Sequence, residues 1–118
     1  MYRMMMKSKV HRATATRTDL DYEGSLSLDP VLMEAADMFP NEQVHVYNIS
    51  NGERFVTYLI KGKKDSGELG VNGAAAHKVS VGDKLIVVTF ALMSDEETNF
   101  CTPRVVMVDE ENRIKLVC

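Results

Sequence analysis

Apolar and polar residues alternate along most of the chain, and this alternation predicts short β-strands. Residues 4–16 contain no Gly or Pro and carry β-branched side chains at Val10, Thr14 and Thr16. Strands are predicted at residues 4–16, 25–28, 44–49, 54–60, 68–71, 84–92, 104–108 and 113–117.

Two short helical segments interrupt the predicted strands. Asp29 can accept hydrogen bonds from the free amides of a helix start, and Pro30 suits the first helical position. The apolar side chains that follow share one helical face as far as Phe39, and Pro40 is expected to end this helix. A second short helical piece is predicted at residues 74–76.

Turns and loops separate these elements. Asn51-Gly52 is the strongest hairpin signal, because both residues tolerate positive φ. Residues 19–25 and 61–67 are polar and are predicted to be loops. The acidic runs at 95–97 and 109–111 are expected to be solvated loops.

The strand count indicates the fold class. Six or more short strands with two small helices are typical of a small, mostly β barrel. A chain of 118 residues fits a single domain. The order of helix, turn and strand in residues 35–49 recurs about 40 residues later, which predicts a barrel of two similar halves.

Charge and composition exclude several classes of partner. The chain carries 14 Lys and Arg against 17 Asp and Glu, so it has no global basic field for nucleic acid. Its longest apolar run is far shorter than the ~20 residues of a membrane-spanning helix. The N-terminal Met4–Met6 is too short for a secretory signal, which indicates the cytoplasm. Cys101 and Cys118 are accordingly interpreted as free thiols.

The histidines offer no metal site. His11, His45 and His77 do not stand at zinc-ligand spacing with one another or with a Cys or carboxylate pair. We therefore expect no bound metal.

The dipeptide Gly24-Ser25 carries a possible self-cleavage chemistry. A Ser directly after a Gly can attack the preceding carbonyl when the loop is strained, because Gly neither blocks the approach nor restricts the dihedrals. The product is an ester, and elimination followed by hydrolysis converts the serine into a pyruvoyl group. The dipeptide alone is equally compatible with an ordinary turn.

Three other segments add weight to this reading when they are taken together with Tyr22–Ser25. They are Lys9–Arg12, Asn51–Tyr58 and Asn72–His77. In this order and spacing, the chain resembles the pyruvoyl-dependent aspartate alpha-decarboxylase family from about residue 4 to residue 109. Each motif alone is weak evidence for the family, whereas the four motifs in this order are specific evidence for it.

The resemblance implies a fold and an assembly. The family fold is a double-psi β-barrel, here of six or seven strands with short helices, and the family forms homotetramers with active sites between subunits. The chain is expected to cleave itself between Gly24 and Ser25 into a short N-terminal and a longer C-terminal chain, and the unbroken sequence is then either a precursor or simply the gene product.

The resemblance also implies a reaction. The family is a group of carbon–carbon lyases that convert L-aspartate to β-alanine and CO₂ for pantothenate, and hence coenzyme A, biosynthesis. The cofactor is the pyruvoyl group derived from Ser25, which forms a Schiff base with the substrate amine and accepts the electrons released by decarboxylation.

Individual roles follow from the matched positions. Tyr58 matches the proton donor, since a phenol held at the reacting carbon can protonate it. Thr57 matches a substrate-binding residue that also donates to the oxyanion from Gly24 during cleavage. Strand alternation puts Tyr58 on the face of Arg54 and puts Thr57 on the opposite face, so Thr57 needs a twist or bulge to reach the same site.

Two cations are candidates for binding the substrate carboxylate. A salt bridge to the departing carboxylate would stabilise the ground state, so Arg54, helped by Lys9, is expected to bind the carboxylate that is kept. The other matched positions are substrate-binding Asn72, Gly73, Ala74 and Ala75 and the site-lining residues His11 and Tyr22.

Two alternatives remain open. The chain could be a β-barrel binding module that never cleaves. It could also be a pyruvoyl enzyme for another acidic amino acid such as glutamate, because two cations do not fix the length of the substrate side chain. A helper protein for maturation is a further possible partner.

Overall fold

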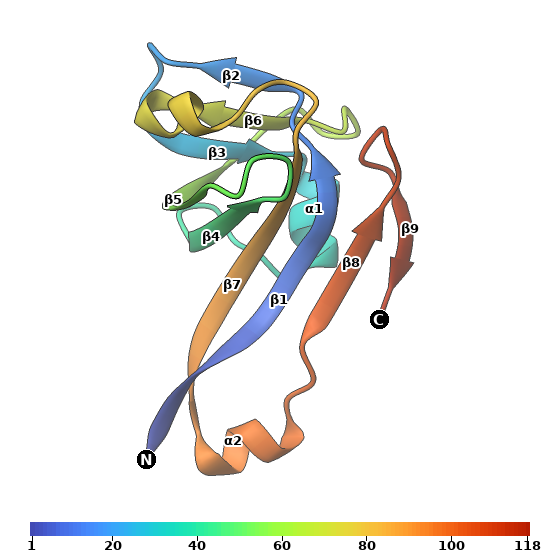
Figure 1. Cartoon of the computed structure of the whole chain (residues 1–118). Helices are drawn as coiled ribbons and strands as arrows, with labels where there is room; N and C mark the ends of the chain where they lie inside the picture. Colours follow the sequence, from blue (N-terminus) through green and yellow to red (C-terminus); the bar gives the residue numbers. More distant parts are fainter.

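The computed structural model describes all residues, 1–118, and consists mainly of β-strands (Figure 1). The predicted mostly β fold is confirmed. No helix is long and apolar enough to cross a bilayer. The helices are α1 (Pro30–Ala35), the 3₁₀-helix η1 (Gly73–Lys78) and α2 (Asp95–Phe100). The strands are β1 (Tyr2–Thr14), β2 (Arg17–Asp19), β3 (Ser25–Leu28), β4 (Gln43–Asn48), β5 (Arg54–Lys61), β6 (Leu69–Asn72), β7 (Lys84–Ser94), β8 (Arg104–Val108) and β9 (Ile114–Val117).

All strands belong to one sheet, with the order β2-β6-β3-β5-β4-β7-β1-β8-β9. β2 stands first and β1 seventh in this order, yet only Ala15 and Thr16 separate them along the chain. The Ala15 amide donates to Asp83 O and the Thr16 amide donates to Leu69 O, each at 2.9 Å. The sheet therefore curls back on itself between β2 and β1, as a small β-barrel does, and the β8–β9 hairpin extends it.

The barrel has two similar halves. In one half β3 leads through α1 to β4, and in the other β6 leads through η1 to β7. The equivalent strands pair with each other, because β3 is antiparallel to β6 and β4 is antiparallel to β7. The repeat predicted from the sequence is therefore present in the strand pairing.

Alternate strand residues fill the interior. Leu26 and Leu28 of β3 face the core beside Leu59 of β5, and all three are fully buried. One cluster of 19 buried apolar residues connects the strands with α1. This core fixes which face of β3, β5 and β6 is left for polar side chains.

Helix α1 is shorter than the sequence predicted. It ends at Ala35 and not at Pro40, because Asp37 adopts a positive φ of 55° and turns the chain. The Met38 amide then donates to Met33 O at 2.8 Å, which closes the helix C-terminus. The prediction that Phe39 lies on the helix face is wrong, since 68% of its surface is exposed.

Two other elements differ from the prediction. Residues 95–97 were expected to form a solvated loop but begin α2, which has a capping box. The Ser94 hydroxyl accepts from the Glu97 amide and the Glu97 carboxylate accepts from the Ser94 amide, and acidic residues suit the first helical turn. Strand β2 was not predicted, because three residues are too few to show alternation.

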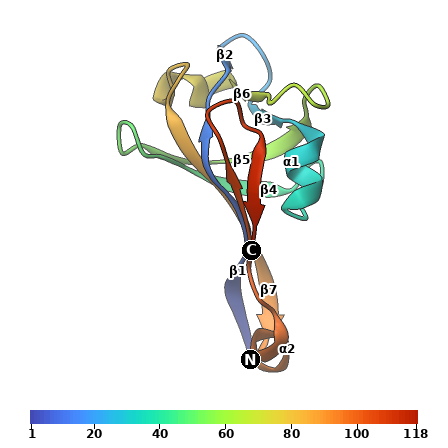
Figure 2. The same ribbon diagram turned by 90° about the vertical axis from the view of Figure 1, so that its right-hand side faces the viewer.

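Strands β1 and β7 continue beyond the barrel as a two-stranded arm that ends at α2 (Figures 1 and 2). The arm exposes the apolar side chains of Tyr2, Met4 and Leu92, and Phe100 of α2 is also exposed. A two-stranded ribbon is marginally stable by itself in water. The arm therefore presents apolar surface that a single chain does not cover.

Candidate active site

Ser25 is the first residue of β3 and lies directly opposite Asn72 of the antiparallel strand β6. Only 1% of Ser25 is exposed. Its hydroxyl donates to Glu23 O at 3.1 Å and accepts from Asn72 Nδ2 at 3.0 Å. A hydroxyl has one proton and two lone pairs, so one lone pair remains free for another contact.

The Asn72 side chain is the polar centre of this site. Its Nδ2 also donates to Ser27 Oγ at 3.1 Å, and both Asn72 and Ser27 are buried. Its Oδ1 is buried without a hydrogen-bond partner. An unpaired buried acceptor is uncommon and can receive a donor from a bound group.

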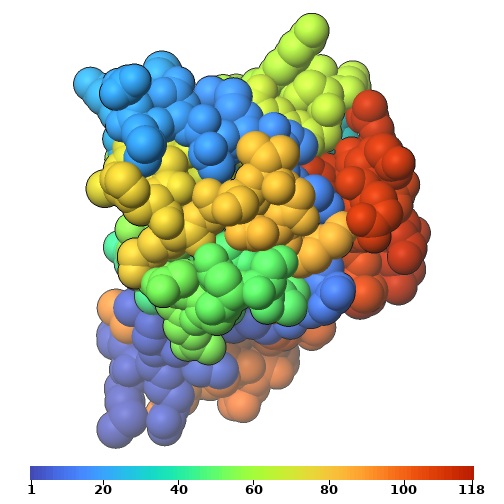
Figure 3. Space-filling view, turned by 45° about the horizontal axis from the view of Figure 1, so that its top comes forward, coloured from blue at the N-terminus to red at the C-terminus, as the bar shows by residue number.

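Gly73 holds the segment that precedes Ser25. Its φ is +74°, and a Cβ built on it would lie 2.6 Å from Gly24 Cα and 2.8 Å from Gly24 N. Only glycine fits both this φ and this close approach. A Cβ built on Gly24 would meet nothing within 4 Å, so the other side of Gly24 is open. Figure 3 shows the segment before Ser25, in blue, against η1, in yellow.

Strand β5 supplies Tyr58 beside Ser25. β3 and β5 are parallel with Leu26 opposite Leu59, and extending this register by one residue sets Ser25 next to Tyr58. Neighbouring strands lie about 4.8 Å apart, so the two residues are adjacent. Tyr58 is 37% exposed and can be reached from solvent.

Thr57 lies on the other face of β5. Arg54, Val56 and Tyr58 are exposed while Phe55 and Thr57 are half-buried, as the alternation predicted. The β4–β5 register contains no bulge that would turn Thr57 outward. The Thr57 hydroxyl makes no hydrogen bond within the chain and is free to donate.

Arg54 begins β5 and stacks its guanidinium 4.4 Å above the centre of the Tyr47 ring. None of the five ion pairs in the chain includes Arg54, so its charge is free for a substrate carboxylate. Arg54 and Tyr58 share a face but lie about 13 Å apart along the strand at Cα. The Arg54 side chain must therefore extend along the strand for its guanidinium to approach a substrate bound beside Tyr58.

Lys9 and His11 lie on a different part of the sheet from Ser25 and Tyr58. Both are on β1, and β7 and β4 separate β1 from β5 in the sheet. His11 lines a pocket of about 220 Å³ with Arg12 and Lys115, and its Nδ1 is buried without a partner. Burial lowers the pKa of His11, and the charges of Lys9 and Arg12 lower it further. β1 is not a sheet neighbour of β3, and neither hydrogen bond of the Ser25 hydroxyl is to Lys9 or His11.

The other predicted site residues lie around the cleavage segment. Tyr22 is exposed in the loop before Gly24, and its carbonyl oxygen would be 3.2 Å from a Cβ on Gly73. Ala74 is exposed, and Ala75 is half-buried against the core. The start of η1 thus borders the segment that contains Gly24.

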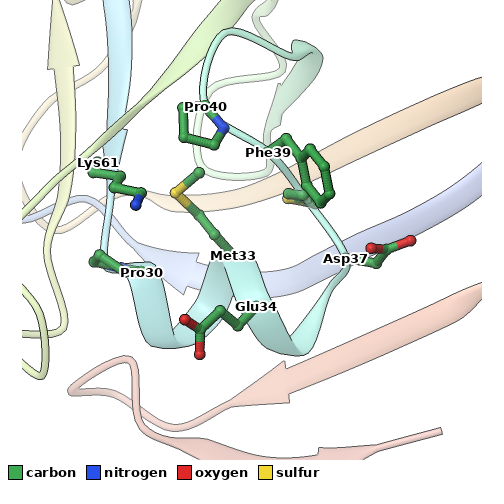
Figure 4. Close-up of a pocket in the computed structure, with 8 residues that line it drawn as sticks. Pro30, Met33, Glu34, Asp37, Phe39, Pro40 and Lys61 are labelled. Carbon is green, nitrogen blue, oxygen red and sulfur yellow. The ribbon is translucent and has the colours of Figure 1, made fainter.

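No surface pocket in the single chain opens at Ser25. The largest, of about 390 Å³, lies between α1 and the loop that follows it (Figure 4). Its wall includes Met33, Phe39 and Lys61 but neither Ser25 nor Asn72. The site therefore has a buried hydroxyl and hydrogen-bond donors but no enclosing cavity within one chain.

Sequence reasoning did not single out Ser27. The signal was available in the alternation of Ser25 and Ser27 with Leu26 and Leu28, which places both hydroxyls on one face of β3. The contact with Asn72 depends on the register of β3 against β6, and that register was not visible in the sequence.

Comparison with known proteins gives consistent matches along the whole chain. The family model for aspartate decarboxylase matches residues 1–115. Aspartate 1-decarboxylase of Ralstonia nicotianae is 53% identical over 115 residues, which cover 98% of this chain and 96% of the relative. The protein of the same name from Syntrophus aciditrophicus is 53% identical over 115 residues, covering 98% and 99%. That of Thermoanaerobacter pseudethanolicus is 51% identical over 113 residues, covering 96% and 97%.

Proposed function

The chain belongs to the aspartate decarboxylase family, and on that premise we propose that it converts L-aspartate to β-alanine and CO₂ for pantothenate biosynthesis. The predicted family resemblance is confirmed. The observation that carries the proposal is the buried Ser25 hydroxyl, which accepts a hydrogen bond from Asn72. Ser25 directly follows Gly24, and Gly24 packs closely on Gly73.

The precursor cleaves itself at Gly24-Ser25. Ser25 Oγ bonds to the Gly24 carbonyl carbon as the peptide C–N bond breaks, and the Ser25 nitrogen takes the hydroxyl proton, which gives an ester. Loss of the Ser25 Cα proton then expels the Gly24 carboxylate and leaves dehydroalanine at the new N-terminus. Water adds to its imine tautomer, ammonia leaves, and residue 25 becomes a pyruvoyl group. The products are residues 1–24 and 25–118.

The contacts of Ser25 support this step. Its proton points to Glu23 O and one lone pair accepts from Asn72, so the free lone pair is available to the neighbouring Gly24 carbonyl. Thr57 is the proposed donor to the oxyanion that forms on Gly24, since its hydroxyl has no partner in the chain. That role requires the Gly24 carbonyl to turn toward the inner face of β5.

The residues around Ser25 fit a pyruvoyl group. Asn72 Nδ2 loses its bond to Ser25 Oγ when that oxygen leaves with Gly24, so its N–H and the unpaired Oδ1 would both be available to the group formed from residue 25. Asn72 and the backbone of Gly73 and Ala74 would hold the group. When formed, the group supplies a carbonyl that accepts the electrons released as CO₂ leaves.

Two residues of β5 handle the substrate. Tyr58 lies beside Ser25 and holds a phenol proton for the carbon that loses CO₂. Arg54 binds the carboxylate that is kept, because its guanidinium has no carboxylate partner in the chain.

The active enzyme is a homotetramer with sites between subunits. Lys9 and His11 are separated from Ser25 within one chain, and no pocket opens at Ser25. The apolar arm of β1 and β7 also needs a partner. A second copy can supply the missing cations and the walls of a cavity. We place the enzyme in the cytoplasm, where the exposed thiols of Cys101 and Cys118 stay reduced.

The test is the intact mass of purified protein together with a β-alanine assay. We expect two chains, 1–24 and 25–118, the longer of which resists Edman sequencing, and we expect β-alanine from L-aspartate but not decarboxylation of L-glutamate. A single chain of full mass after long incubation, in folded protein, would indicate either a helper requirement or a non-enzymatic barrel, and cell extract added to the sample separates the two.

A further inference from the structure

The Asn72 side chain uses both of its amide protons on one face of β3. Nδ2 donates to Ser25 Oγ at 3.0 Å and to Ser27 Oγ at 3.1 Å. Ser27 stands opposite Gly70 in the β3–β6 register, and the Arg17 guanidinium covers Gly70, 2.6 Å from where a Cβ would be. All three polar residues are at least 97% buried, so water does not replace a lost bond.

These two bonds decide which end of the amide faces Ser25. In the observed orientation both N–H groups are paired and only Oδ1 lacks a partner. The reversed orientation would pair Oδ1 with the serines but leave two buried N–H groups unpaired, and unpaired buried N–H groups are the rarer and costlier case. Without Ser27 the observed orientation would lose one of its two bonds.

We propose that Ser27 is a positioning residue for the self-cleavage: it holds the Asn72 amide so that an N–H faces Ser25 Oγ. This inference rests on the proposed function. The N–H occupies one lone pair of Oγ and stabilises negative charge on it as its proton leaves. Ser27 itself touches no reacting atom, since its contact is with Nδ2 of Asn72.

The experiment measures the cleavage rate of newly made chains. Wild-type protein and variants are synthesised in a timed cell-free reaction, and the fraction of intact chain is followed by mass spectrometry. Ser27→Ala should cleave about three- to tenfold more slowly, which corresponds to one net buried hydrogen bond. Ser27→Thr keeps the hydroxyl and should cleave within about twofold of wild type.

A third variant separates hydrogen bonding from packing. Ser27→Cys fills the same space, but its sulfur is a weak acceptor, so it should be slow like Ser27→Ala. Ser8→Ala is the matched control, because Ser8 is equally buried and bonds Thr89 Oγ1 at 2.6 Å on strands away from Ser25. Ser8→Ala should cleave at the wild-type rate.

The outcomes separate the positioning role from the proposed function. If wild-type protein cleaves and Ser27→Ala cleaves at the same rate, the positioning role alone is overturned. Fast cleavage of Ser27→Cys, or slow cleavage of Ser27→Thr, assigns the effect to packing and also overturns it. Wild-type protein that never cleaves, even with cell extract, overturns the proposed function and the positioning role with it.

Discussion

Gly73 approaches Gly24 so closely that a Cβ at Gly73 would lie 2.6 Å from the Gly24 Cα. The Gly73→Ala variant must therefore displace the peptide that is to be cleaved, and it also places alanine at a φ of +74°. We expect slow or absent cleavage and a loss of about 1–2 kcal/mol in the free energy of unfolding. Mass spectrometry and urea unfolding measure the two effects.

The control for this variant is Gly52→Ala. Gly52 has a similar φ of +80°, but a Cβ built on it meets nothing within 4 Å. It should lose similar stability and cleave normally. Equal cleavage of both variants would mean that contact with Gly73 does not hold Gly24 in place.

Ser25→Ala should remove cleavage and activity together. The hydroxyl is both the attacking group and the precursor of the pyruvoyl group, so no neighbour can replace it. The fold should persist, with a cost of about 1–3 kcal/mol because one N–H of Asn72 loses its partner. Circular dichroism, intact mass and β-alanine formation are the measurements, and decarboxylation by this variant would exclude a cofactor made from residue 25.

Tyr58→Phe should separate cleavage from turnover. The substitution removes one oxygen from a residue on the exposed face of β5, so the strand should pack as before. Cleavage at Gly24 should continue, whereas β-alanine formation should fall by about 10²–10⁴, as for a positioned acid. Normal turnover would identify Tyr58 as a packing residue, and failure to cleave would mean that Thr57 is not the sole donor during cleavage.

Arg54→Gln should weaken substrate binding and leave cleavage unchanged. The guanidinium lies over the Tyr47 ring and has no carboxylate partner in the chain, so its loss leaves no other charge unpaired. The KM for L-aspartate should rise by about 10- to 100-fold, the value of a charged hydrogen bond. A change in kcat alone, with KM constant, would place Arg54 at the reacting carbon instead.

Asp83→Asn should reduce the pH dependence of stability. The Asn48 side chain and the Ser80 amide donate to Asp83, and these bonds lower the pKa of its carboxyl in the folded protein. A carboxyl with a lowered folded pKa contributes stability above its unfolded pKa of about 3.9 and loses it as pH falls through the folded value. Urea unfolding should show wild type more stable than the variant at pH 7, with a smaller difference at pH 2–3. A constant difference would contradict the assignment.

Most of the strands could be predicted from local sequence, whereas the contacts of the site could not. The strands predicted at residues 25–28, 54–60 and 68–71 lie close to the observed bounds of β3, β5 and β6. The bond from Asn72 to Ser27 depends on pairing between residues 45 positions apart, which local periodicity does not encode. That β1, which carries Lys9, is not a sheet neighbour of β3 likewise depends on strand order, which local periodicity does not encode.

Local capping explains the errors in the helices. Asp37 takes the left-handed conformation that glycine usually provides, so α1 ends without the expected sequence signal. The start of α2 had a signal in Ser94 and Glu97, but the run of acidic residues was interpreted as solvated loop.

Strands β1 and β2 both precede the bond between Gly24 and Ser25. In the unbroken chain, residues 1–24 supply these two strands, with Val10, Ala13 and Ala15 in the core and hydrogen bonds to β6, β7 and β8, so the proposed cleavage would leave the 1–24 fragment bound within the fold. Under the proposed cleavage, each subunit is one polypeptide in the precursor, whereas each subunit of the mature protein would consist of two. Its unfolding midpoint should rise with protein concentration, and its refolding after denaturation should be second order. The peptide bond that the proposed cleavage breaks is thus also the bond that keeps β1 and β2 covalently linked to the other strands while the chain folds.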